Sequence, residues 1–197
     1  MPSFAFRRAA LATLALVAVV APAHAHVGAG LASSFSAGFG HPLGGLDHVA
    51  VMIAVGLWAA QQGGRAIWAW PAAFVGAMLV GGGLGIAHVP LPFVEPAILA
   101  SVVALGLLVA LAVELPVAAG AAIVGLFALF HGHAHGTEAG AGIAGLEYMT
   151  GFVIATALLH ALGIAARIGF GARFGTLVRA AGAACAALGA GLALGMI

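Results

Sequence analysis

Residues 66–87 read AIWAWPAAFVGAMLVGGGLGIA, an apolar stretch without a single charged side chain. Spanning the hydrocarbon core of a bilayer, roughly 30 Å thick, takes about 20 such residues in a helix. The rest of the chain has the same character, because 64% of its 197 residues are hydrophobic and only 6% are charged. A mean hydropathy of +1.22 excludes a water-soluble globular domain. The sequence therefore predicts an all-α membrane protein.

Five further apolar runs flank this stretch, separated by Gly, Pro and charged residues that favour turns. The connections are too short to hold a second, soluble domain. We therefore expect residues 26–197 to form one bundle of six transmembrane helices. The first and fourth runs are short and lead into polar motifs, where we expect helix ends or partly unwound turns. The six runs cover residues 46–61, 66–87, 93–113, 117–130, 143–166 and 177–197.

The first 25 residues have the pattern of a cleaved signal peptide. Arg7 and Arg8 form a positive n-region, residues 9–20 are apolar, and Ala23-His24-Ala25 matches an A-x-A cleavage site. The mature chain is therefore predicted to begin at His26. If the segment stayed attached as an anchor, it would add a seventh helix and leave the topology of the others unchanged.

The arginines set the expected orientation in the bacterial inner membrane. Once the N-terminus is exported, the loops near Arg65, Arg167, Arg173 and Arg179 all fall on the cytoplasmic side, as the positive-inside rule requires. Both mature termini are then external, and only Glu114 and His160 lie towards the cytoplasm. The opposite side receives His26, His41, Asp47, His48, His88, Glu95, His131, His133, His135, Glu138 and Glu147.

The first motif is His41-Pro42-Leu43-Gly44-Gly45-Leu46-Asp47-His48. On a straight helix His41 and His48 share a face but lie about 10 Å apart, too far for both to bind one ion. A break at the glycine pair would bring His41 back towards Asp47 and His48, as in the discontinuous helices of transporters. Alternatively, Asp47 is a first-turn carboxylate stabilised by the helix dipole, and His41-Pro42 is an entry turn.

The second motif runs from Phe130 to Glu138 and contains three histidines. His131 and His135 are four residues apart on one helix face, and Glu138 follows after three more, a spacing suited to chelation. His133 points elsewhere and is either an accessory ligand or a solvated loop residue. Deeper in the fifth run, His160 either marks an exit path for the ion or hydrogen-bonds a neighbouring helix, and we expect the hydrogen bond. Trp58, Trp68 and Trp70 flank the first cytoplasmic loop and are interpreted as membrane-interface anchors.

Both motifs offer imidazoles and carboxylates but no thiolates, which favours a borderline divalent metal such as Ni²⁺ or Co²⁺. Charged residues inside membrane spans usually pair with one another or line a pathway. Because the ligands occupy several positions along one membrane face, we interpret them as a transport path. Protonated imidazoles do not bind metal, so low external pH is expected to weaken binding.

Two other functions remain open from the residues alone. A membrane enzyme with zinc or haem would use the same ligand types, although the chain has no H-E-x-x-H motif. A metal sensor would bind the ion without moving it. We expect a transporter without enzymatic activity, prosthetic group or nucleic-acid partner, whose ligands are the metal ion and the lipid bilayer. The sequence has no phosphate-binding loop, so coupling to ATP would require another protein.

The two motifs together resemble those of the HupE/UreJ family of nickel and cobalt permeases. His-x5-Asp-His is matched by His41, Asp47 and His48, and Phe-His-Gly-x-Ala-His-Gly-x-Glu by residues 130–138. The similarity extends over the mature chain and implies secondary uptake of Ni²⁺ or Co²⁺ for metalloenzymes such as hydrogenase or urease. It implies an ion path formed by His41, Asp47, His48, His135 and Glu138 with Glu95. His26, His88, His133 and Glu147 are predicted as accessory positions.

Overall fold

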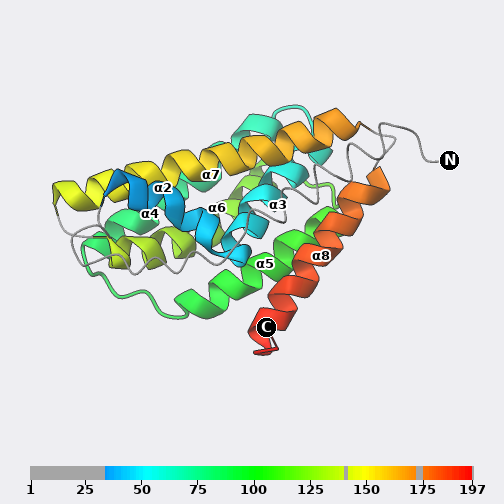
Figure 1. Ribbon diagram of the computed structural model, residues 1–197. Helices are drawn as coiled ribbons and strands as arrows, with labels where there is room; N and C mark the ends of the chain where they lie inside the picture. The colour runs from blue at the N-terminus through cyan, green and yellow to red at the C-terminus, as the bar shows by residue number, and fades with distance from the viewer. Residues whose placement is uncertain (1–33, 140–141, 172–174, 197) are drawn as a thin grey trace.

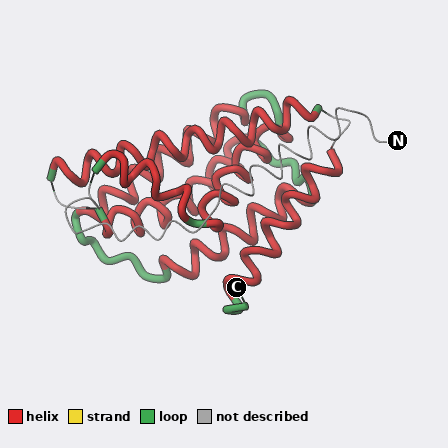
Figure 2. The backbone as a smooth tube through the Cα atoms, viewed as in Figure 1, coloured by secondary structure: helices red, strands yellow, loops and turns green. Residues whose placement is uncertain are grey.

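The chain is helical throughout the part that the computed structural model describes, which comprises residues 34–139, 142–171 and 175–196. Seven α-helices and no strand occur in these residues (Figure 1, Figure 2). The predicted all-α class is confirmed, whereas the predicted signal peptide, residues 1–25, lies outside the described residues. The helices are α2 (Phe35–Gly44), α3 (Leu46–Gln62), α4 (Ala66–Ile86), α5 (Val94–Ala110), α6 (Val117–Glu138), α7 (Ile143–Phe170) and α8 (Gly175–Ala193).

Each of the six predicted apolar runs forms a helix, and the additional helix α2 precedes the first run. Within the described ranges, α4, α6, α7 and α8 are long and apolar enough to cross a membrane. The pair α2 and α3 also qualifies if it is taken as one span bent by 86°. With 17 residues, α5 is apolar but shorter than a typical span. The chain is therefore a multi-pass membrane protein, and the count of six spans stays a prediction.

Glycines let the helices approach one another closely. Helix α4 packs along α6, α5 along α8, and both α2 and α3 along α7 (Figure 1). At these contacts a Cβ atom on the glycine would overlap the backbone of the facing helix. Small residues are favoured at such contacts because helices in lipid associate largely through van der Waals packing. The glycines at these contacts include Gly81 and Gly132 between α4 and α6, Gly56 and Gly163 between α3 and α7, and Gly106 and Gly182 between α5 and α8.

Two of the three predicted interface tryptophans lie in the core instead. Trp58 and Trp70 are fully buried, with ring centroids 4.2 Å apart. Their Nε1–H groups donate to the carbonyl oxygens of Val113 and Val117, each at 2.8 Å, so burial leaves no indole donor unpaired. Only Trp68 is exposed, beside the guanidinium of Arg65. The interpretation as interface anchors is therefore wrong for Trp58 and Trp70.

The second motif forms a helix end, one of its two expected forms, because α6 continues through the histidines to Glu138. Gly132 and Gly136 face α4 at backbone distance, where a Cβ would overlap Met78 and Gly82 respectively. These glycines serve close packing rather than a turn. Consequently the side chains of the second motif have fixed positions on a helix buried against α4.

Candidate metal site

The helix that contains the first motif is interrupted at Gly45. This residue is extended, with φ −112° and ψ 124°, between the end of α2 and the start of α3. The 86° bend brings the rings of His41 and His48 to a centroid distance of 6.2 Å. The predicted break at the glycine pair is confirmed. Asp47 lies in the first turn of α3, where the helix dipole favours a carboxylate.

The two motifs, far apart in the sequence, meet at one end of the bundle. His48 from α3 and His135 from α6 approach to 2.6 Å between their Nε2 atoms. One ligand atom each from His48, His131 and His135 lies within 4.8 Å of the others, and we call these three residues the inner group. His41, His135 and Glu138 meet the same criterion and form the outer group. Because His135 belongs to both groups, the two are contiguous.

Carboxylates fix the orientation of two of the inner imidazoles. Nδ1 of His48 donates to Oδ1 of Asp47 at 3.0 Å, and Nδ1 of His135 donates to Oε2 of Glu138 at 3.3 Å. Ionised carboxylates only accept hydrogen bonds, so each neutral ring has its Nε2 lone pair free. Such carboxylate–histidine pairs orient metal-binding imidazoles.

The two Nε2 atoms face each other at hydrogen-bonding distance, an arrangement that would equally suit a cation between them. Two nitrogen ligands at 2.0–2.1 Å from one ion are about 2.9 to 3.4 Å apart for octahedral to tetrahedral angles. The present separation is 2.6 Å, so the rings of His48 and His135 need to move apart by less than about 1 Å to accept an ion. The donor set therefore suits a borderline divalent metal.

The third inner imidazole is oriented by a hydroxyl group from α5. Ser101 donates its only hydroxyl proton to the carbonyl oxygen of Ile98 at 2.6 Å, so its oxygen accepts from Nε2–H of His131 at 2.9 Å. This assigns the lone pair of His131 to Nδ1, a buried atom with no hydrogen-bond partner among the described residues. Sequence reasoning missed Ser101, because one serine in an apolar run has no informative spacing.

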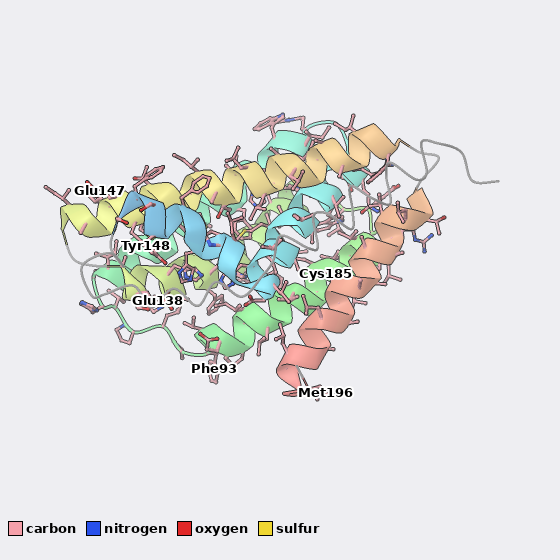
Figure 3. The ribbon with its side chains drawn as sticks, viewed as in Figure 1. Phe93, Glu138, Glu147, Tyr148, Cys185 and Met196 are labelled. Carbon is pink, nitrogen blue, oxygen red and sulfur yellow. The ribbon has the colours of Figure 1, made fainter. Side chains whose placement is uncertain are left out.

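Aromatic side chains from α7 enclose the outer group. Phe152 packs on the ring of His135 at 4.4 Å between centroids, and Tyr148 lies 5.8 Å from that of His41. Glu138 and Tyr148 lie at the same end of the bundle in Figure 3. The hydroxyl of Tyr148 is buried without a hydrogen-bond partner in the described part of the chain. Neither aromatic residue was predicted, because an aromatic in an apolar helix is ordinarily a core residue.

Exposure decreases from the outer group to the inner group. The side chains of Glu138 and His41 are 55% and 37% exposed, and those of His48 and His135 only 12% and 4%. His131 is fully buried. The site therefore begins at a solvent-accessible carboxylate and leads to nitrogen ligands inside the bundle.

Three other predicted positions lie apart from both groups. Glu95 is exposed in the first turn of α5, as a water-exposed first-turn acid would be. Glu147 is exposed on α7, His88 is exposed in the connection after α4, and His26 lies outside the described residues. No cluster of potential metal ligands in the described part of the chain includes Glu95, Glu147 or His88.

Two further histidines depart from their predicted surroundings. His133 is not a solvated loop residue but a buried helical one, and its Nε2–H donates to the carbonyl oxygen of Val89 at 2.7 Å. It thereby links α6 to the connection between α4 and α5, and it points away from the inner group as expected. His160 does not form the predicted hydrogen bond, because neither ring nitrogen has a partner among the described residues.

Comparisons with known proteins identify the family of this chain. The family model described as HupE / UreJ protein matches residues 14–192. Protein HupE from Rhizobium leguminosarum bv. viciae is 48% identical over 184 residues, which cover 93% of this chain and 96% of the relative. No solved structure matches significantly. Because both the family model and this relative extend over nearly the whole chain, the protein belongs to the HupE/UreJ family.

Proposed function

We propose that this protein is a secondary uptake permease for Ni²⁺, with Co²⁺ as a second substrate, in the bacterial inner membrane. The main support is the convergence of His48, His131 and His135, whose ligand atoms lie within 4.8 Å inside a multi-pass helical bundle. The resemblance to nickel and cobalt permeases points the same way. The metal is transported cargo in this proposal, and hydrogenase or urease is the class of enzyme that it would supply.

Imidazole ligands account for the proposed selectivity. Mg²⁺ and Ca²⁺ prefer oxygen ligands, whereas Ni²⁺ and Co²⁺ bind imidazole nitrogen well. The inner group offers three nitrogens, and the nearest carboxylates, Asp47 and Glu138, bond to the Nδ1 atoms of His48 and His135. An ion held by neutral imidazoles keeps much of its charge, so it binds reversibly, as transport requires.

The two groups suggest how the ion moves inward. Glu138 and His41 are accessible and supply negative charge and a first nitrogen ligand for the hydrated ion. His135 then exchanges the ion from the outer group to the inner group, because it belongs to both. Water is replaced stepwise by nitrogen ligands along this path, which avoids a fully dehydrated intermediate.

The finer topology belongs to the same proposal. Residues 1–25 are removed as a signal peptide, and six helices from residue 46 to the C-terminus cross the membrane. Helix α5, with 17 residues, is about 26 Å long at 1.5 Å per residue and spans only a locally thin bilayer. Helix α2 is then a re-entrant segment that brings His41 to the outer group, and both mature termini are external.

Uptake into proteoliposomes tests the function directly. Purified protein should move radiolabelled Ni²⁺ and Co²⁺ into the vesicles with saturable kinetics, and excess Mg²⁺ should not compete. Protein-free vesicles are the control. Metal binding without flux would support the sensor instead, and retained haem or tightly bound zinc after purification would support the enzyme. Either result, obtained with well-folded protein, would refute the permease.

A further inference from the structure

His160 is a buried imidazole that the described structure leaves without any hydrogen bond. It lies in α7 with an exposed fraction of 1%, and neither Nδ1 nor Nε2 has a partner within the described residues. Burial of an unpaired polar group is destabilising, and a leucine at the same place would avoid that cost. A structural role in packing therefore does not explain why an imidazole is present.

The position of His160 continues the line of histidines deeper into the bundle. Phe152, which packs on His135, precedes it by eight residues on α7, a depth of about 12 Å along the helix. The ring of Phe74 is close to both histidines, with its centroid 6.0 Å from the ring of His131 and 4.9 Å from that of His160. Phe74 therefore links His160 to the most buried ligand of the inner group.

We propose that His160 is a further binding station for the transported borderline divalent cation, on the cytoplasmic side of Phe74. This inference rests on the proposed permease function. Its neighbours offer weak ligands of suitable type, because Thr156 lies one turn earlier on α7 and its hydroxyl contacts the thioether of Met78 at 3.9 Å. One imidazole with such neighbours binds more weakly than three imidazoles. The ion therefore occupies His160 briefly after it leaves the inner group.

Replacing His160 by leucine separates this role from a structural one. His160→Leu should lower the initial rate of Ni²⁺ uptake at least tenfold, while equilibrium binding of Ni²⁺ to the inner group stays within twofold of wild type. Thermal stability should not fall, since the leucine removes two unpaired polar atoms. Thr150→Val, which removes a hydroxyl group from an exposed position on the same helix, should transport normally. Uptake by His160→Leu within twofold of the wild-type rate would overturn the proposal.

A second measurement reports on the position without relying on transport. In a Cys185→Ala background, His160→Cys places a thiol at the station, and Co²⁺ bound there gives a near-ultraviolet thiolate-to-cobalt charge-transfer absorption. His160→Ser in the same background is the control and should show no such band. Absence of the band in folded protein that binds Co²⁺ at the inner group would overturn the station. If the wild-type protein fails to take up Ni²⁺, the permease function is refuted. The charge-transfer band still shows, independently, whether cations reach the position of His160.

Discussion

Asp47 acts on the site through the ring of His48. Its Oδ1 accepts the Nδ1 proton of that ring at 3.0 Å, so the carboxylate holds the tautomer whose Nε2 lone pair faces His135. Asp47 is thus a first-turn carboxylate stabilised by the helix dipole, the alternative interpretation from the sequence, and it also orients the ring of His48.

Asp47→Asn tests the importance of this charge. The amide keeps the size of the side chain but loses its negative charge. Uptake of Ni²⁺ should therefore fall by about tenfold or more, as expected when a residue that orients a metal-binding histidine is replaced. Membrane abundance should stay near normal. Glu114→Gln, an exposed residue after α5, is the matched control and should be nearly silent. Wild-type uptake by well-expressed Asp47→Asn across a range of Ni²⁺ concentrations would exclude this role.

Ser101→Ala removes the acceptor that fixes the tautomer of His131. In wild type this acceptor lies 2.9 Å from Nε2 of the fully buried His131 ring. Without it, the Nε2–H group loses its partner, and the tautomer with the lone pair on Nδ1 is no longer favoured. We expect the apparent affinity for Ni²⁺ to fall about tenfold, with protein abundance unchanged. Isothermal titration of the detergent-purified protein measures this affinity. An affinity equal to that of wild type would show that His131 binds metal without help from Ser101.

Sequence reasoning found the ligands of the site better than the residues that orient them. His48, His135 and Glu138 stand out because ionisable side chains in apolar runs are rare and their spacing matches helix geometry. Ser101 and Phe152 act from other helices, and nothing in their local sequence differs from an ordinary core residue. Their roles depend on which helices are neighbours, which spacing within one run does not determine.

At the scale of elements, the break between α2 and α3 creates the outer group. The chain at Gly45 is extended with negative φ, a conformation open to any residue, so its glycine is not required by the backbone. A Cβ there would lie 2.6 Å from Oδ1 of Asp47 and 2.9 Å from Nδ1 of His48. Gly45 therefore leaves room for the Asp47–His48 pair.

Gly45→Ala should disturb that pair while leaving the helices intact. Because the new methyl group displaces Asp47, His48 or both, we expect uptake of Ni²⁺ to fall several-fold with little loss of folded protein. Gly44→Ala is the matched control, since a Cβ at Gly44 meets nothing within 4 Å. The comparison is made by uptake at equal membrane abundance. Equal uptake by the two variants would show that crowding at Gly45 is unimportant.

The helices themselves were more predictable than their ends. All six apolar runs form helices, because long uncharged stretches leave the backbone no partners in lipid except its own. The sequence left open whether the second motif is a helix end or an unwound turn, since glycines in the last turns of α6 resemble a loop in sequence. Only the facing backbone of Met78 and Gly82 shows that Gly132 and Gly136 are contacts. Similarly, the carbonyls that pair with Trp58 and Trp70 belong to residues far away in sequence, Val113 before α6 and Val117 at its start.

At the scale of the whole molecule, charges separate towards opposite ends of the bundle. Arg65 precedes α4, Arg167 lies in the last turn of α7, and Arg179 near the start of α8 donates to the carbonyl oxygen of Ala110 at the end of α5. The metal-binding groups lie at the other ends of α6 and α7. The positive-inside rule predicts that the arginine end is cytoplasmic and that the histidine end faces outward.

This orientation predicts which introduced thiols an impermeant reagent reaches. Ala87, exposed in the connection after α4, lies at the histidine end, and Ala112, exposed after α5, lies at the arginine end. In a Cys185→Ala background, Ala87→Cys should react with an impermeant maleimide in intact spheroplasts. Ala112→Cys should react only after the membrane is permeabilised. The reverse pattern would place the histidine groups on the cytoplasmic side and contradict the proposed orientation. Only α5 separates the two positions. Equal reaction of both thiols in intact spheroplasts would therefore show that α5 does not cross the membrane.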